Sequence, residues 1–138
     1  TACNMLNVNA PKSRAAWHLH VLSASLNCDF MVHFSSVAAI FGGAGQASYA
    51  SASEYLNALA LCSMDCGRAE RSLQLPLVSS EGMGAAFVAK QHHWRHGAIT
   101  PNQMCHCLGV SLGPFIYTAV CLILPWRLLP LVLSVPQK

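Results

Sequence analysis

The chain has 138 residues, of which 54% are hydrophobic and only 9% are charged, and its formal net charge is +3 at pH 7. This length suits one small domain, and so little charge predicts that other protein covers much of the surface. Lys and Arg are scattered rather than gathered into a basic stripe, which argues against a nucleic-acid-binding function. The chain starts with Thr1 and shows no signal-like segment, which fits a piece of a longer protein.

The predicted elements of the first half alternate between helix and strand. Apolar residues at helical spacing predict a helix over residues 11–25. The short apolar run at 29–34 predicts a buried parallel strand. Three glycines within residues 42–45 predict a loop, and a second helix follows over 47–65, with Gly67 as its stop signal.

The second half continues the same alternation. We expect a strand over 71–78, a loop over 79–84, a helix over 85–96, a helix that begins at Thr100 and Pro101, and a strand over 115–124. Strands separated by helices predict an α/β fold with a parallel, doubly wound sheet.

The C-terminal segment, residues 108–135, is apolar and carries Arg127 as its one charge. Its length would permit a membrane helix, which needs about 20 apolar residues. However, prolines and glycines divide the segment, and the longest uninterrupted piece is the ten residues 115–124. A buried strand is therefore favoured over a membrane-associated segment, and we expect no membrane partner.

Seven cysteines occur in the chain without a CxxC pair. The odd count favours reduced thiols in a cytoplasmic protein, some of them buried, with Cys28 and Cys121 in strand-like runs. The densest group of potential metal ligands is His92, His93, His96, Cys105, His106 and Cys107. Because this group lacks a second paired unit, we expect no metal site. His33, within the predicted strand, is expected to be a hydrogen-bonded core residue.

The most informative stretch is SSVAAIFGGAGQASY, residues 35–49. It brings serines from the end of a predicted strand to a tyrosine at the start of the next helix, an arrangement that can hold a carbonyl between two proton-bearing groups. The stretch resembles the ketoreductase domain of modular polyketide synthases, in the short-chain dehydrogenase/reductase superfamily. Further segments similar to this family follow in its order: KSRAAWHLH before the stretch, then SLQLPLVSSEGMGAA, HGAITPNQMCHCLGVSL and YTAVCLILPW after it.

The resemblance implies the catalytic residues one by one. The family's Lys falls on Lys12, its Ser on Ser36 and its Tyr on Tyr49, with Lys12 and Ser36 lying 37 and 13 residues before the tyrosine. The family's fourth residue, an Asn four positions after the Tyr, is Ser53 here. Asn57, one helical turn further, does not match that position. Ser53 therefore makes the usual proton relay doubtful.

The chemistry explains why the family needs these residue types. Hydride addition to a ketone leaves an alkoxide that must receive a proton, and the resemblance implies Tyr49 as the donor. Because a free phenol holds its proton up to about pH 10, Lys12 is implied to ease proton release by its charge and to hold the cofactor ribose. Ser36 is implied to align the carbonyl oxygen. The resemblance also places residues 76–78 (Pro76, Leu77 and Val78) beside the nicotinamide.

The Gly-rich turn that binds a dinucleotide pyrophosphate has no counterpart after a first strand in this chain. We therefore expect residues 1–138 to be the C-terminal portion of a ketoreductase domain whose cofactor-binding half lies outside the chain. The implied function is NADPH-dependent reduction of a β-ketoacyl group on an acyl carrier protein, within a larger synthase. The alternative is a non-catalytic ketoreductase remnant with a structural or interaction role, and the isolated chain is expected to be inactive.

Overall fold

The computed structural model describes residues 7, 9–26, 28–78, 98–113 and 119–120. In chain order the elements are the π-helix η1 (Ala10–Arg14), the helix α2 (Ala15–Ser23), the strand β1 (Met31–Ser36), the short helix α3 (Ala38–Phe41), the helix α4 (Ala47–Asp65), the strand β2 (Glu70–Leu75), the helix α6 (Pro101–Ser111) and the strand β3 (Ala119–Val120).

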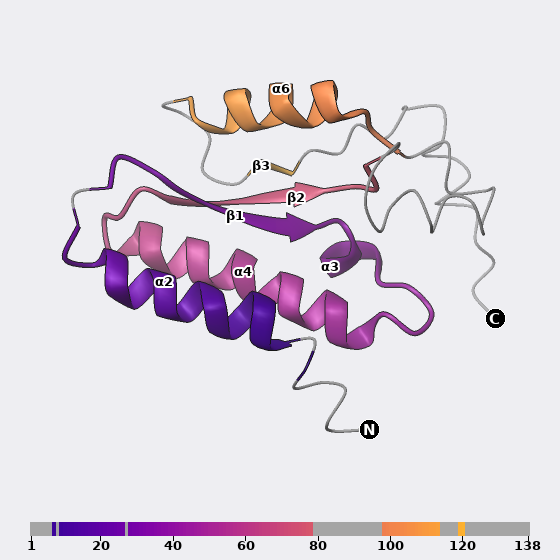
Figure 1. Cartoon of the computed structure of the whole chain (residues 1–138), viewed down its shortest axis with the longest axis horizontal. Coiled ribbons are helices and arrows are strands. Elements are labelled where there is room, and N and C mark those ends of the chain that lie inside the picture. Colours follow the sequence, from indigo (N-terminus) through magenta and orange to yellow (C-terminus); the bar gives the residue numbers. More distant parts are fainter. Residues whose placement is uncertain (1–6, 8, 27, 79–97, 114–118, 121–138) are drawn as a thin grey trace.

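The described strands form one parallel sheet in the order β1-β2-β3. In its register, Met31 lies opposite Glu70 and Ser36 lies opposite Leu75, so the two longer strands end side by side. Helices α2 and α4 cover one face of this sheet and α6 covers the other (Figure 1). This arrangement confirms the α/β fold with a parallel, doubly wound sheet.

Two predicted helices agree closely with the structure. The helix expected over 47–65 is α4, and Gly67 beyond it has a φ of 77°, which favours glycine at a helix end. The helix expected to begin after Thr100 is α6. Its Thr100 side chain accepts the Gln103 N–H, and the Gln103 side chain accepts the Thr100 N–H in return, which completes a capping box.

The predicted strands are displaced by one to three residues. The strand expected over 29–34 is observed at 31–36 because its ladder starts at Met31 and extends through both serines. The strand expected over 71–78 ends at Leu75, since Pro76 has no N–H to continue the ladder. The short helix α3 was not expected from the sequence.

Part of the first predicted helix is a π-helix. Residues 10–14 form the π-helix η1, and residues 15–23 continue it as the α-helix α2. The expected helix over 11–25 is therefore confirmed, but its first turn is a π-helix. The expected loop over 79–84, the expected helix over 85–96 and most of the expected strand over 115–124 lie outside the described residues.

The packing of α4 against the sheet includes buried hydrogen bonds as well as apolar contacts. The Ser35 hydroxyl donates to the Ser53 carbonyl at 2.9 Å, and the Ser72 hydroxyl donates to the Asn57 side chain. All four residues are buried. A small apolar cluster of Ala16, Leu56 and Leu59 completes the contact between α2 and α4. Hydrogen bonds as well as apolar contacts therefore hold α4 on the sheet.

Among the described residues the free cysteines are Cys28, Cys62, Cys66, Cys105 and Cys107. Cys107 is buried, but Cys28 is exposed and precedes β1, so its expected place in a strand is wrong. No cluster of three potential metal ligands occurs within the described ranges, and His92, His93 and His96 lie outside them. None of the helices in the described part of the chain is long and apolar enough to span a membrane.

Candidate active site

The candidate site lies where β1 and β2 end. Ser36 is the last residue of β1, and the Val37 N–H donates to the Leu75 carbonyl at 3.0 Å, which keeps the two strand ends together. Tyr49 lies in the first turn of α4, and this helix starts near the end of β1 and runs back beneath the sheet (Figure 1). In open parallel sheets the carboxyl ends of the strands are where ligands bind. The position therefore suits a binding site.

Lys12 reaches this edge from η1. Its Nζ donates to the Ser53 hydroxyl at 2.8 Å and lies 4.3 Å from the centroid of the Tyr49 ring. An ammonium group at this distance interacts favourably with the face of an aromatic ring. The structure thus brings together Lys12, Tyr49 and Ser53, which are 41 residues apart at the extremes.

Ser53 is completely buried and has partners on both sides. Its hydroxyl accepts the Lys12 ammonium and donates to the Tyr49 backbone carbonyl at 2.9 Å. The one proton of this hydroxyl is therefore already used in the bond to the Tyr49 carbonyl. Ser53 acts here as an anchor that links the lysine to the helical turn carrying Tyr49.

Ser36 is buried, and its hydroxyl proton has no acceptor among the described residues. Its Oγ accepts the Ala38 N–H at 3.2 Å, which orients the oxygen and leaves the O–H free to donate to a carbonyl. None of the hydrogen bonds among the described residues links the Ser36 side chain to Lys12, Tyr49 or Ser53; its neighbour Ser35 makes the connection to α4, by donating to the Ser53 carbonyl. Successive side chains of a strand point to opposite faces, so the serine pair serves both sides of β1.

Tyr49 is half-buried, and none of the hydrogen bonds within the described residues involves its phenol. The loop before α4 turns sharply at Gly42 and Gly45, whose φ values are 65° and 74°. These values lie in the region that favours glycine. The two glycines thus allow the chain to leave the end of β1 and re-enter as α4 with Tyr49 in its first turn.

The three residues expected at the nicotinamide, Pro76, Leu77 and Val78, directly follow β2 and are partly buried. The Leu77 carbonyl accepts the Ile99 N–H at 2.8 Å, and Val78 forms an isolated parallel bridge with Ile99. This segment therefore leaves the sheet at the same edge as Ser36.

Sequence reasoning missed two polar residues at this end of the sheet. Ser35 connects β1 to α4, and the serine pair in the sequence was its only signal. Gln74, its neighbour in register on β2, is 6% exposed, and its Oε1 has no hydrogen-bond partner among the described residues. A single glutamine in a predicted strand carries no signal of this kind.

Comparison with known proteins agrees with this geometry. The family model described as the KR domain matches residues 1–80, more than half of the chain. Polyketide synthase GfsA of Streptomyces halstedii is 46% identical over 88 residues, which are 60% of this chain and 1% of that protein. The highly reducing polyketide synthase sphB of Aspergillus fumigatus is 53% identical over 53 residues, which are 37% of this chain and 2% of that protein.

Solved structures give the same relationship. The first ketoreductase of the tylosin polyketide synthase superposes with a TM-score of 0.79 at 27% identity, over 96% of this chain and 30% of that one. An A-type ketoreductase from a modular polyketide synthase superposes with a TM-score of 0.76 at 32% identity, over 90% of this chain and 27% of that one. The chain thus spans under a third of these structures and a few per cent of the synthases. With the Lys12–Tyr49–Ser53 group at the strand ends, these matches show that the chain belongs to the KR family, the ketoreductase domains of polyketide synthases.

Proposed function

We propose that this chain forms the catalytic side of a β-ketoacyl reductase. The substrate is a β-ketoacyl group carried on an acyl carrier protein, the product is the β-hydroxyacyl form, and the cofactor is NADPH. The observation that carries this proposal is the contact of the Lys12 ammonium with both the Ser53 hydroxyl and the Tyr49 ring.

Each residue then has a separate task. The Ser36 hydroxyl, oriented by the Ala38 N–H, donates to the ketone oxygen and aligns it. Tyr49 gives its phenolic proton to the oxygen as negative charge develops there. One such donor typically contributes on the order of 10²–10³ in rate. Bound NADPH supplies the hydride.

The residues at the strand ends fit a nicotinamide cofactor. An ammonium group has three donors, and Ser53 accepts one from Lys12, so the remaining donors suit the hydroxyls of a ribose. Residues 76–78 would border the nicotinamide at the same edge. Gly42 and Gly45 are separated from β1 by the short helix α3 and lead into the helix that carries Tyr49, so they do not match the Gly-rich turn that joins a first strand directly to a phosphate-binding helix. We infer that a preceding half of the domain, in the same synthase, holds the pyrophosphate.

Ser53 modifies the proton relay in this proposal. Its hydroxyl proton goes to the Tyr49 carbonyl, so Ser53 positions Lys12 and does not pass a proton onward. The Lys12 ammonium would hold the ribose hydroxyls of the cofactor, and its charge beside Tyr49 would stabilise the phenolate that remains after proton transfer.

The test uses the ketoreductase domain of the parent synthase that contains this chain. Tyr49→Phe should reduce the NADPH-dependent reduction of a β-ketoacyl thioester by about 10²–10⁴-fold, the usual contribution of a positioned proton donor. Tyr55→Phe is the matched control, because Tyr55 lies on the same helix and is 38% exposed. Equal rates for the two variants would remove Tyr49 from its role.

One alternative is a non-catalytic remnant with a structural role in the synthase. It is favoured by the Ser53 hydroxyl, whose proton is already donated to the Tyr49 carbonyl. That alternative predicts no reduction by the unmutated parent domain and no saturable NADPH binding. Reading the coding sequence before Thr1 gives a second test, since a Gly-rich turn in frame supports a working reductase.

A further inference from the structure

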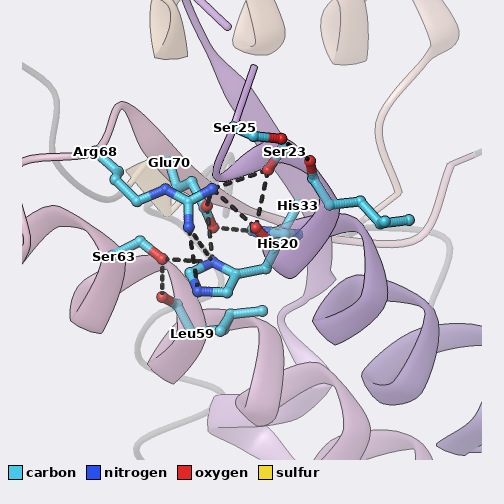
Figure 2. Close-up of polar contacts among 9 residues, drawn as sticks. His20, Ser23, Ser25, His33, Leu59, Ser63, Arg68 and Glu70 are labelled. Carbon is cyan, nitrogen blue, oxygen red and sulfur yellow. Dashed lines mark hydrogen bonds and ion pairs between the residues drawn. The ribbon is translucent and has the colours of Figure 1, made fainter. Parts of the chain in front are cut away.

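A second polar cluster lies at the opposite end of the sheet, around Glu70 (Figure 2). The Glu70 carboxylate is buried, with 3% of its side chain exposed. Its Oε1 accepts from His20 Nδ1 at 2.8 Å and from Arg68 Nη2 at 2.9 Å. Its Oε2 accepts from His33 Nε2 at 3.1 Å. We call these four residues the Glu70 cluster.

Each segment around the carboxylate contributes a group to it. His20 comes from α2, His33 from β1 and Arg68 from the turn between α4 and β2. From α4, the Ser63 hydroxyl lies 3.1 Å from His20 Nδ1 and donates to a backbone carbonyl of its own helix. The prediction that His33 is a hydrogen-bonded core residue is confirmed.

Arg68 also holds the end of α2 directly. Its Nη2 donates to the His20 carbonyl at 2.9 Å and to the Ser23 hydroxyl at 2.8 Å. These acceptors are in the last turn of α2. The guanidinium therefore links the carboxylate to both the side chain and the backbone of this helix.

Burial opposes ionisation of Glu70, but hydrogen bonds from His33 and His20 and the charge of His20 together outweigh it. The pKa of Glu70 consequently lies below its ordinary value of 4.5. With the carboxylate ionised, the Arg68 guanidinium balances its charge. A buried charge that loses its partner is strongly destabilising, so the cluster is held together or lost as a unit.

The cluster and the candidate site are connected by one helical run. Lys12 lies in η1 and His20 in α2, which continues η1 without a break. At 1.5 Å per residue the two are about 12 Å apart along the axis. Between them only Ala16 is buried, against Leu56 and Leu59 of α4. The run is thus attached by Lys12 at one end and by His20 at the other, with a small apolar contact in the middle.

We propose that the Glu70 cluster is a remote positioning device for Lys12. By holding the far end of the η1–α2 run, Glu70 sets the tilt of that run across α4 and so keeps the Lys12 ammonium on Ser53 and over Tyr49. The assignment of Lys12 to catalysis rests on the proposed function, but the coupling between Glu70 and Lys12 does not. Glu70 touches no reacting atom and is a positioning residue.

The test measures how fast Lys12 is acetylated by a water-soluble acetyl ester in the full chain, near pH 8, by mass spectrometry. The rate is referred to the same peptide in the denatured chain. Glu70→Gln should raise the acetylation rate of Lys12 by about tenfold, because local opening of the run exposes the amine. Glu70→Asp should restore part of the protection. Asp65→Asn is the matched control, since it removes an exposed carboxylate from α4 and should stay within about twofold of the unmutated chain.

Circular dichroism must show that each variant keeps its helices. Equal acetylation of Lys12 in folded Glu70→Gln and Asp65→Asn would overturn the proposal. If Glu70→Gln does not fold, hydrogen exchange on the unmutated chain decides between the outcomes. As the pH falls below 4.5 and through the lowered pKa of Glu70, the carboxylate is protonated, and the amides of residues 12–23 should lose protection before those of residues 71–75. Simultaneous loss would overturn the proposal.

Neither readout involves ketone reduction, so the two proposals fail separately. A parent domain that does not reduce ketones, but whose Lys12 responds to Glu70→Gln, would overturn the proposed function alone. A working reductase in which Glu70→Gln leaves the acetylation rate of Lys12 unchanged would overturn the positioning role alone.

Discussion

The two ends of the β1–β2 pair use the same helices in opposite ways. At the amino end, the Glu70 carboxylate has partners on both oxygens, and Arg68 donates to three different acceptors. At the carboxyl end, within the described part of the chain, the Lys12 ammonium donates one hydrogen bond of a possible three and the Ser36 hydroxyl donates none. The buried Gln74 Oε1 at this end also lacks a partner among the described residues.

The difference lies in how completely each cluster is satisfied. Hydrogen-bonding capacity that is filled within the protein stabilises the fold and leaves nothing for a ligand. Capacity that is left open at a strand end is available to a substrate or cofactor. Substitutions of the open groups at the carboxyl end should therefore change the reaction, whereas substitutions of groups that are already paired within the protein should change stability.

The largest effect is expected for Lys12→Met in the parent ketoreductase domain. Under the proposed function, loss of the ammonium should lower kcat/KM for ketone reduction by about 10³-fold, because it removes the charge beside Tyr49 and the donors proposed to hold the cofactor ribose. Arg14→Met is the control, since Arg14 is an exposed cation in the same π-helix. The comparison fails if both variants reduce the ketone at the same rate.

Glu70→Ala should have the next largest effect, on stability. It leaves Arg68 and two histidines without their common acceptor, and breaking a buried pair costs about 3 kcal/mol of unfolding free energy. Urea unfolding of the chain, followed by circular dichroism, measures this cost. Asp65→Asn should change the midpoint little, and a Glu70→Ala midpoint equal to that of Asp65→Asn would contradict the structural role of the cluster.

Acid should weaken the amino end in a defined pH window. The pKa of Glu70 is lowered in the folded chain, so its contribution to stability is complete above 4.5 and is lost as the pH falls through the folded value. Each unit of pKa difference corresponds to about 1.4 kcal/mol. Urea unfolding across this range should show a steeper loss for the unmutated chain than for Glu70→Gln. Parallel curves would show that other groups carry the acid sensitivity.

The smallest effect is expected for Ser35→Ala at the carboxyl end. It removes a buried hydrogen bond to the Ser53 carbonyl, which should cost about 1 kcal/mol of unfolding free energy. Ser51→Ala is the matched control, because the Ser51 hydroxyl bonds within its own exposed helical turn. Indistinguishable thermal midpoints for the two variants would mean that Ser35 does not hold α4.

The sequence predicted the helices well where residues that start or stop a helix were present. Helix α4 was predicted at its observed bounds because Gly67 marks its end, and α6 because Thr100 and Pro101 mark its start. The end of β1 was predicted two residues early, since polar Ser35 and Ser36 looked like the start of a loop. Both serines belong to the strand because their hydroxyls have hydrogen-bond partners, Ser53 in α4 and Ala38 in α3. The local sequence pattern does not reveal these partners.

The candidate site was predicted because its spacing resembled a known family, whereas the Glu70 cluster was not predicted at all. Its residues come from four segments, and each one alone looks like an ordinary surface or core residue. Only the packing of α2 and α4 on the sheet brings His20 to Glu70. The role of Ser53 also needed the structure, since its partners are Lys12 and a backbone carbonyl.

The polar packing of α4 on the sheet has a consequence for alignment. A helix held by apolar contacts alone can slip by one turn, about 5.4 Å, and still bury similar surface. Here a slip would separate Ser35 from Ser53 and Ser72 from Asn57, and each buried group left unpaired costs about 1–3 kcal/mol. The position of α4 along the sheet is thus set by matched hydrogen-bond donors and acceptors. That position also sets the distance between Tyr49 and the end of β1.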